Sequence, residues 1–105
     1  MRQWHVDPRR MCRQHLLGEH VEHHMIAATI LSGKSLGRHL ELGQIDTRTL
    51  KVRHDAIVKE MEARGYNHKS PFIQPVVSAP FGWFDAEDNL RELLRRCPEC
   101  AKIKL

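Results

Sequence analysis

Three side chains capable of acid–base chemistry recur at helical spacing near the start of the chain. His15, Glu19 and Glu22 are four and three residues apart, so a helix would place them on one face. Two carboxylates and an imidazole on an uncovered face could form a catalytic site or an ordinary solvated surface. The opposite face, which a small domain would bury, holds Leu17, Val21, Ala28 and Leu31.

A cysteine motif near the C-terminus offers a second kind of chemistry. Cys97 and Cys100 form a Cys-x-x-Cys pair, which is half of a zinc site and needs two further ligands. The candidates for these ligands are Cys12, His5, His20, His23 and His24, of which His20 and His24 are four residues apart. The alternatives are a reversible disulfide and two ordinary thiols. Because the chain has neither a second cysteine pair nor a His-Glu-x-x-His motif, no metal is expected.

Three helices are expected to position these residues. The first covers residues 13–31. The second covers residues 47–64 and is followed by Gly65 at the position of a C-terminal cap. The third begins near Asp85 and ends at Pro98. The buried positions expected on the second and third helices are Leu50, Ile57, Val58, Met61, Leu90, Leu93 and Leu94.

The connecting segments contain glycine and proline rather than helical patterns. Asp7 and Pro8 predict a short capped turn, and residues 33–46 predict a loop with at most a short helical piece. Residues 70–84 predict an extended loop that lies over the core. The expected fold is therefore all-α, a compact single domain of residues 1–105 with three main helices and irregular connections.

Composition restricts the classes of partner. The chain has 105 residues and a net charge of +4, from 17 Lys and Arg against 13 Asp and Glu, so a polyanion is a reasonable partner. Its three cysteines do not describe a secreted disulfide framework. No apolar run reaches membrane-spanning length. These observations predict a monomer in the reducing cytoplasm that does not contact a membrane.

Two sequence blocks together resemble a known enzyme family. The first is Gln14-His15-Leu16 followed by Glu19 and Glu22. The second begins at Arg53-His54, continues through Glu60, and ends with Arg64-Gly65-Tyr66-Asn67 and Lys69. Both are similar to the corresponding helices of the phage pyrimidine-dimer DNA glycosylases of the endonuclease V type. The two blocks cover about 30 residues in the expected order, whereas the segment between them is shortened and the aromatic-rich tail is missing.

The resemblance implies a DNA repair glycosylase that also cleaves the strand at the abasic sugar. It assigns the nucleophile to the α-amino group of Met1, which would attack the sugar C1′ and form an imine, and the assisting carboxylate to Glu22. Arg2 matches the basic residue that follows the nucleophile. A terminal amine has an ordinary pKa near 8, so a neutral fraction exists at pH 7. The implied partner is double-stranded DNA with a damaged base, and the chemistry requires no cofactor or metal.

Several basic and polar side chains are candidates for the DNA interface. Besides Arg2, Gln14 and His15, the candidate DNA-binding residues are Arg9, Arg10, Arg13, Lys34 and Lys69. Any one of these basic residues could equally belong to a solvated face. The aromatic segment 81–84 and Trp4 could stack on bases or could pin loops to the core.

The sequence departs from the family pattern beside the proposed carboxylate. Where the family carries arginines that hold phosphates, this chain has Val21 and Met25. The histidines at positions 20, 23 and 24 would compensate only in part, because neutral histidine is a poor substitute for arginine. Three alternatives therefore remain. They are a non-catalytic DNA- or nucleotide-binding module, a glycosylase for another damaged or modified base, and a metal-dependent hydrolase that uses His15, Glu19, Glu22 and His23.

Overall fold

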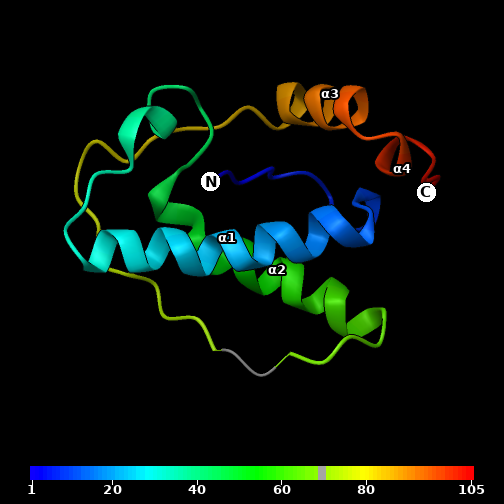
Figure 1. Ribbon diagram of the computed structural model, residues 1–105, viewed down its shortest axis with the longest axis horizontal. Coiled ribbons are helices and arrows are strands. Elements are labelled where there is room, and N and C mark those ends of the chain that lie inside the picture. The colour runs from blue at the N-terminus through cyan, green and yellow to red at the C-terminus, as the bar shows by residue number, and fades with distance from the viewer. Residues whose placement is uncertain (69–70) are drawn as a thin grey trace.

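The N-terminal segment runs beside the longest helix before the first helical turn begins. The computed structural model describes residues 1–68 and 71–105. In Figure 1 the segment before η1 (Pro8–Arg10) lies between α1 (Arg13–Leu31) and α3 (Ala86–Arg96). The predicted cap at Asp7 is present, since its carboxylate accepts from the N–H of Arg9 and Pro8 begins the turn.

Helix α1 has the predicted bounds, but it buries a different face from the one predicted. Its buried residues are Leu16, Glu19, His23, Ile26 and Ala27. The expected buried stripe was wrong at three of its four positions, because Val21 is 54% exposed, Leu31 is 77% exposed and Ala28 is exposed as well, whereas Leu17 is partly buried against the core. The reason is that two polar residues, Glu19 and His23, lie on the buried face and find polar partners there.

Helix α2 (Leu50–Ala63) packs against α1 and follows the short turn η3 (Thr47–Thr49). The predicted segment 47–64 is thus helical, with a tighter first turn. Leu50, Ile57 and Met61 are buried as expected, together with Arg53 and His54. Gly65 has the positive φ of +82° that a helix-ending glycine adopts, and its N–H bonds to Glu62 O.

Helix α3 begins after Asp85, whose carboxylate accepts from the N–H of Asp88. Pro98 ends α3 as predicted, but it also begins α4 (Pro98–Ala101), which the sequence analysis missed. Proline is favourable in the first turn of a helix, where its missing N–H is not needed. A further short turn, η2 (Gly37–His39), lies in the predicted loop 33–46.

Backbone contacts and the Trp83 side chain hold the extended segment 71–84 against the rest of the fold. Phe81 O accepts from Thr47 N at 2.8 Å, and Trp83 donates from Nε1 to Glu41 O at 3.1 Å. Gly82 has a φ of +85°, and a Cβ there would meet Ile45 O at 1.9 Å, so only glycine fits this contact. The loop-pinning interpretation of the aromatic segment is therefore supported, although Trp83 remains 51% exposed.

The core consists of two apolar clusters with a buried polar layer between them. One cluster joins the N-terminal segment to α3 and α4, and its buried members are Trp4, Val6, Met11, Leu16, Ile57, Met61, Leu93, Cys97 and Cys100. The other contains Ile26, Ala27, Leu36, Ile45, Leu50 and Phe72. The predicted all-α class is confirmed. Of the helices that the structure describes, none combines the length and apolar character needed to span a bilayer.

Candidate active site

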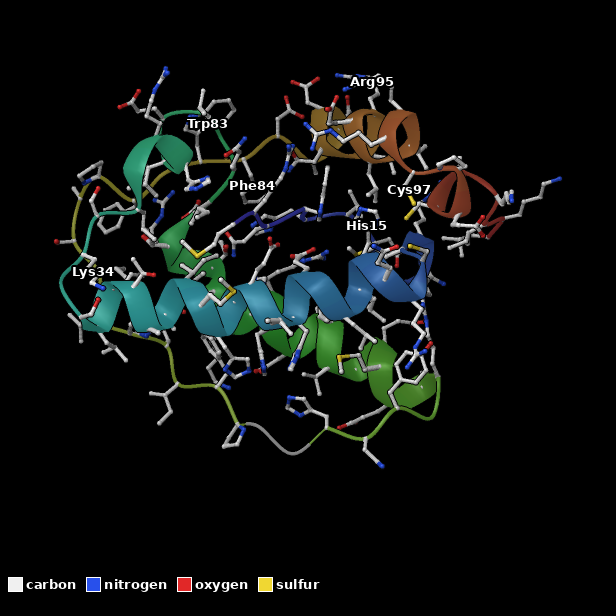
Figure 2. The ribbon with its side chains drawn as sticks, in the orientation of Figure 1. His15, Lys34, Trp83, Phe84, Arg95 and Cys97 are labelled. Carbon is white, nitrogen blue, oxygen red and sulfur yellow. The ribbon has the colours of Figure 1, made fainter. Side chains whose placement is uncertain are left out.

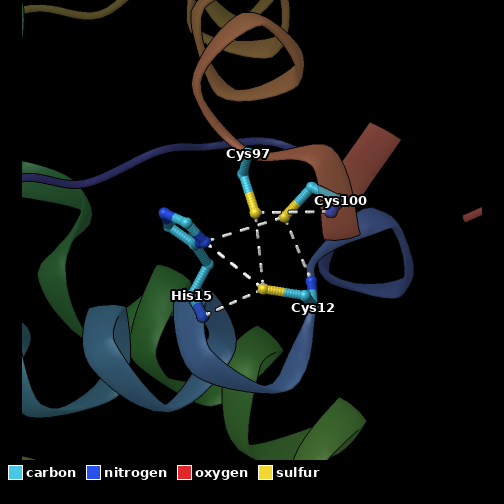
Figure 3. Close-up of side chains that lie close together, drawn as sticks. All are labelled: Cys12, His15, Cys97 and Cys100. Atoms are coloured by element: carbon cyan, nitrogen blue, oxygen red, sulfur yellow. Dashed lines mark hydrogen bonds between the residues drawn. The ribbon is translucent and has the colours of Figure 1, made fainter. Parts of the chain in front are cut away.

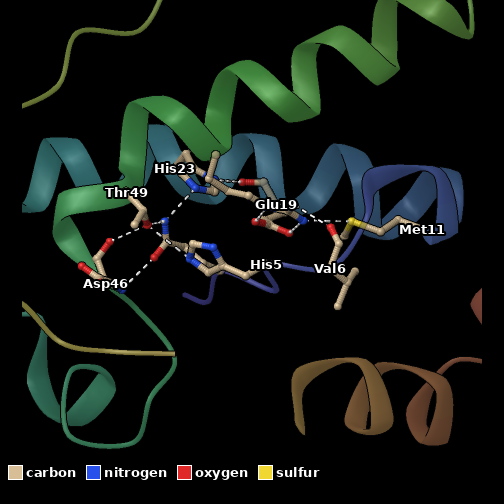
Figure 4. Close-up of polar contacts among 9 residues, drawn as sticks. His5, Val6, Met11, Glu19, His23, Asp46 and Thr49 are labelled. Carbon is tan, nitrogen blue, oxygen red and sulfur yellow. Dashed lines mark hydrogen bonds and ion pairs between the residues drawn. The ribbon is translucent and has the colours of Figure 1, made fainter. Parts of the chain in front are cut away.

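A buried glutamine fixes the position of the N-terminal segment. Gln3 is fully buried, and its Oε1 accepts from the N–H of Asp46 at 2.7 Å. Its Nε2 donates to Thr49 Oγ1 at 3.2 Å and lies 3.1 Å from His23 Nε2. Because His23 Nδ1 faces the carbonyl of Glu19 at 2.8 Å (Figure 4), Nδ1 carries the proton and Nε2 accepts. Met1 and Arg2 therefore extend from a firmly bonded residue.

A pocket of about 340 Å³ lies beside this segment, against the first half of α1. It brings together six residues that the sequence singled out, namely Arg2, Trp4, Gln14, His15, Glu19 and Glu22. The remaining lining residues are Gly18 and Arg96. The pocket thus combines a carboxylate, two guanidinium groups and an aromatic wall from three separate parts of the chain.

Glu22 lies in this pocket close to the N-terminus. Burial raises the pKa of its carboxyl group, whereas the nearby Met1 ammonium and the backbone N–H of Arg2 act to lower it. The net direction is upward, which favours a carboxyl group able to exchange a proton. Met1 itself is half-buried, and its side chain packs against the apolar cluster around Ile26 and Phe72.

Arg2 is held in place by contacts that the sequence analysis did not anticipate. Its Nη2 donates to Asn89 Oδ1 at 2.9 Å, and its guanidinium lies 4.0 Å from the ring centroid of Trp4. Its Nε is buried and has no hydrogen-bond partner among the described residues. Burial and the neighbouring Arg96 lower the pKa of Arg2. Asn89 and Arg96 were missed, although a polar residue among the leucines of α3 is a detectable signal.

A second hollow of about 390 Å³ lies on another side of Arg2. Its lining includes three acidic residues of α3 and its cap, namely Asp85, Asp88 and Glu92. Arg2, Arg91 and Arg95 line the same hollow, but Arg91 pairs with Asp88 and Arg95 pairs with Glu92. The three carboxylates offset the three arginines, and Glu22 is not among the lining residues, so the pocket beside Glu22 is the better candidate.

Glu19 is structural rather than catalytic. Both of its carboxylate oxygens accept from Arg53, from Nε at 2.7 Å and from Nη2 at 2.9 Å, and its side chain is fully buried. His23 is equally occupied, since its two ring nitrogens face Gln3 and the Glu19 carbonyl. The metal-dependent hydrolase built from His15, Glu19, Glu22 and His23 is therefore wrong, because two of its four ligands are already bonded.

The predicted basic residues do not gather into one surface. Arg9 pairs with Asp7 at 2.7 Å, and Arg10 lines a separate hollow beside Leu90. Arg13 lies 5.3 Å from the ring centroid of Tyr66. Lys34 follows the far end of α1, a helix about 28 Å long, and lines a different hollow with residues 76–80 (Figure 2). Lys69 lies outside the described residues.

The histidines of α1 do not replace the missing arginines. His23 is fully buried, and burial together with the neighbouring His54 lowers the pKa of His20 to about 4, so it is uncharged at neutral pH. Val21 and Met25, which stand where the family has arginines, are about half exposed. The outer surface of α1 beside Glu22 is thus apolar at these two positions.

Two groups of side chains among the described residues could each hold a metal ion. One is Cys12, His15, Cys97 and Cys100, and the other is His20, His24, His54 and His68. Five of these side chains were predicted as possible ligands, namely Cys12, Cys97, Cys100, His20 and His24. His15, His54 and His68 were not, because only the folded chain brings them to their partners.

Comparison with protein families matches residues 1–74 to the family described as pyrimidine dimer DNA glycosylase. The match includes the N-terminal segment, α1 and α2, and so all the pocket residues except Arg96. Neither the search of curated proteins nor the search of solved structures finds a match. Because the matched segment is well over half of the chain, the protein belongs to the pyrimidine dimer DNA glycosylase family.

Proposed function

We propose that the protein excises a damaged pyrimidine from double-stranded DNA, and then cleaves the strand through an imine formed by the α-amino group of Met1. The observation that carries this proposal is the pocket in which Glu22, Arg2, Gln14 and His15 meet beside the N-terminus. Family membership supports a DNA substrate and glycosylase chemistry in general. The pocket supports the role of Glu22, and the charge of the Met1 ammonium acts on that carboxyl group.

The first half of the reaction is displacement of the base. The neutral amine of Met1 attacks the sugar C1′, so that a C1′–N bond forms while the bond from C1′ to the base breaks and the base leaves with the bonding electrons. The carboxylate of Glu22 stabilises the positive charge that develops on the sugar. Loss of the amine protons and opening of the sugar ring give the imine.

The second half is strand cleavage by β-elimination. Removal of a proton from C2′ of the imine breaks the C3′–O bond, and the 3′ phosphate leaves as an anion. Glu22 takes this proton, and its burial-raised pKa suits a group that must bind a proton in one step and release it later. The role of Glu19, by contrast, is to hold Arg53 and so the N-terminal segment, through the carbonyl of Val6.

Phosphate binding is assigned to Arg2 and Arg96. Both side chains line the pocket, and Arg96 also pairs with Glu92 at 2.5 Å. A DNA phosphate in the pocket would accept from these two guanidinium groups. Because Val21 and Met25 cannot bind phosphate, a damaged base other than the cyclobutane dimer stays the alternative substrate.

The test is borohydride trapping of the covalent intermediate. The protein is incubated with an abasic duplex, an ultraviolet-irradiated duplex and an undamaged duplex, and the adduct is located by mass spectrometry of peptides. We expect an adduct at the Met1 amine with the abasic duplex, and with the irradiated duplex if the dimer is the substrate. Trapping with the abasic duplex alone would favour another damaged base.

Glu22→Gln is the decisive variant, and Glu62→Gln, at an exposed position of α2, is its matched control. We expect Glu22→Gln to lower strand cleavage by about 10²-fold or more while binding to the abasic duplex persists, and Glu62→Gln to behave as the parent. A folded protein that binds damaged DNA but forms no adduct would contradict the lyase and favour the non-catalytic module. An adduct on a lysine would contradict the role of Met1.

A further inference from the structure

The three cysteines of the chain meet His15 where the start of α1 contacts α4 (Figure 3). Cys12 Sγ lies 3.8 Å from Cys97 Sγ and 3.3 Å from His15 Nδ1, and Cys100 Sγ lies 3.8 Å from His15 Nδ1. All three cysteines are free thiols. All four ligand atoms lie within 4.8 Å of one another.

These separations are those of a tetrahedral zinc site. With Zn–S bonds of about 2.3 Å and Zn–N bonds of about 2.05 Å, the edges of a regular tetrahedron are about 3.8 Å between sulfurs and about 3.5 Å between sulfur and nitrogen. The observed 3.8 Å and 3.3–3.8 Å agree with these edges. A disulfide would need the sulfurs at about 2 Å instead.

The backbone around the sulfurs supports thiolate ligands. Cys97 Sγ accepts from Cys100 N, Cys100 Sγ accepts from Cys12 N, and Cys12 Sγ accepts from His15 N. Each sulfur thus receives one backbone N–H at 3.2–3.5 Å. Donors of this kind stabilise the negative charge of a metal-bound thiolate and orient it. We propose that Cys12, His15, Cys97 and Cys100 bind one structural zinc ion.

This site would connect the two ends of the chain. Cys12 and His15 lie at the start of α1 within the family-matched segment, whereas Cys97 and Cys100 lie beyond residue 74. His15 also lines the candidate active-site pocket, and Arg96, another lining residue, directly precedes Cys97. The zinc ion would therefore fix two walls of the pocket without touching the substrate.

Metal analysis and cobalt spectroscopy of the purified chain test this site. After reconstitution and removal of loose metal, we expect zinc at the site, and Co²⁺ in its place should give intense visible bands of tetrahedral geometry and a near-ultraviolet thiolate-to-cobalt band. Cys100→Ser should lose one equivalent of bound metal and the thiolate-to-cobalt band. His39→Gln removes a histidine that belongs to neither cluster, so it should keep the metal and the band. Wild-type protein without thiolate–cobalt absorption would overturn the proposal even if Cys100→Ser failed to fold.

A second cluster stands on a separate observation. His20 and His24 of α1, His54 of α2 and His68 of the segment after α2 point their Nε2 atoms into one region. All four Nε2 atoms are buried without a hydrogen-bond partner among the described residues. Buried polar atoms are nearly always satisfied, so four converging unsatisfied nitrogens need an explanation.

A carboxylate beside His54 shows which nitrogen of this ring is free to bind a metal. His54 Nδ1 lies 3.0 Å from Asp55 Oδ1, and because a carboxylate only accepts, Nδ1 carries the proton and Nε2 keeps its lone pair. A carboxylate behind a ligating imidazole is the usual partner in metal sites. The geometry points to a second ion at the four histidines, a divalent late transition metal of the kind that imidazole prefers.

His68→Gln separates the two sites, because His68 lies outside the helices and its loss leaves the cysteine site intact. With zinc as the probe, we expect two equivalents in the wild type, one in His68→Gln and two in His39→Gln. In cobalt-loaded His68→Gln the thiolate band should persist. A wild type that binds a single equivalent, all of it lost in Cys100→Ser, would overturn the four-histidine site. The trapping assay tests the proposed function by a different readout, since it detects a covalent adduct and not bound metal.

Discussion

Arg53 is bonded through all three of its guanidinium nitrogens. Nε and Nη2 donate to the Glu19 carboxylate, and Nη1 donates to Val6 O at 2.6 Å. Nη2 also lies 3.4 Å from Met11 Sδ. This one side chain therefore ties α2 to α1 and to the N-terminal segment, and Lys could not reproduce its forked geometry.

Removing one partner of this ion pair should be strongly destabilising. Arg53→Ala leaves the Glu19 carboxylate buried without a counter-charge, so we expect a loss of about 3–5 kcal/mol in the free energy of unfolding. Urea unfolding followed by circular dichroism measures it. Arg95→Ala, which removes an exposed arginine paired with Glu92, is the control and should cost less than about 1 kcal/mol. Similar losses in both variants would contradict the structural role of Arg53.

His5 is kept neutral by its surroundings. Burial first, then the positive charge of Arg53 and the neighbouring His23, lower its pKa to about 4, and Asp46 opposes them. Its ring stacks on Phe84 with a centroid distance of 3.8 Å. Because the folded pKa is below the ordinary 6.5, the unfolded chain takes up the proton first as the pH falls. The contribution to stability is complete above pH 6.5 and is lost progressively between pH 6.5 and 4.

His5→Asn removes this titration while keeping a residue that tolerates the φ of +54° at this position. One proton changes stability by at most about 1.4 kcal/mol per pH unit, and partial exposure of the ring reduces this, so we expect a difference of about 1 kcal/mol. Urea unfolding at pH 7.5 and pH 5.0 should show a larger loss for the wild type than for His5→Asn. Equal losses in the two proteins would show that His5 does not contribute.

At the scale of elements, the helix bounds were predictable because their signals are local. Asp85 caps α3, Gly65 follows α2 and Pro98 ends α3, and each acts within one turn of its own position. The face that α1 buries was not predictable in this way. Glu19 and His23 are tolerated inside only because Arg53 and Gln3, distant in sequence, satisfy them.

The same distinction applies to the candidate site. Gln14, His15 and Glu22 share one helix, so their proximity follows from spacing, and Met1 and Arg2 were assigned by family resemblance. Asn89 and Arg96 were missed because only the folded chain brings α3 to Arg2. The metal ligands could not be predicted as a set for the same reason, since His15 and Cys97 are 82 positions apart in the sequence but adjacent in the fold.

The N-terminal segment is the element on which the proposed nucleophile depends. Gln3→Ala would leave the N–H of Asp46 and the Nε2 of His23 without their buried partner, so we expect a loss of about 1–3 kcal/mol in stability. Because Met1 and Arg2 would also lose their anchor, borohydride trapping should fall by about tenfold or more in protein shown to be folded. Trapping at the wild-type level in a destabilised Gln3→Ala protein would mean that the segment needs no anchor.

At the scale of the whole molecule, the family-matched part and the C-terminal part meet at the pocket. Residues 1–74 supply the groups proposed for catalysis, while α3 and the residues around it supply Asn89 and Arg96. Leu93 and Cys100 complete the apolar cluster around Trp4. The C-terminal part therefore supports the fold and the pocket together.

The dispersed basic residues predict a shallow salt dependence of DNA binding. The net charge is +4, and among the described arginines only Arg2 and Arg96 line the pocket. Each phosphate contact contributes about −0.9 to the slope of log K against log salt concentration, so we expect a slope of only about −2 to −4 for an abasic duplex. Fluorescence anisotropy over a series of salt concentrations measures this slope.

Single substitutions then assign the contacts. Arg2→Gln and Arg96→Gln should each make the slope shallower by about 1, because each removes one phosphate contact. Lys34→Gln should leave it unchanged, since Lys34 lies beyond the end of α1, about 14 Å along the helix from Glu22, and lines another hollow. If Lys34→Gln altered the slope and Arg2→Gln did not, DNA would lie along the far end of α1, and the pocket beside Glu22 would not be where the backbone binds.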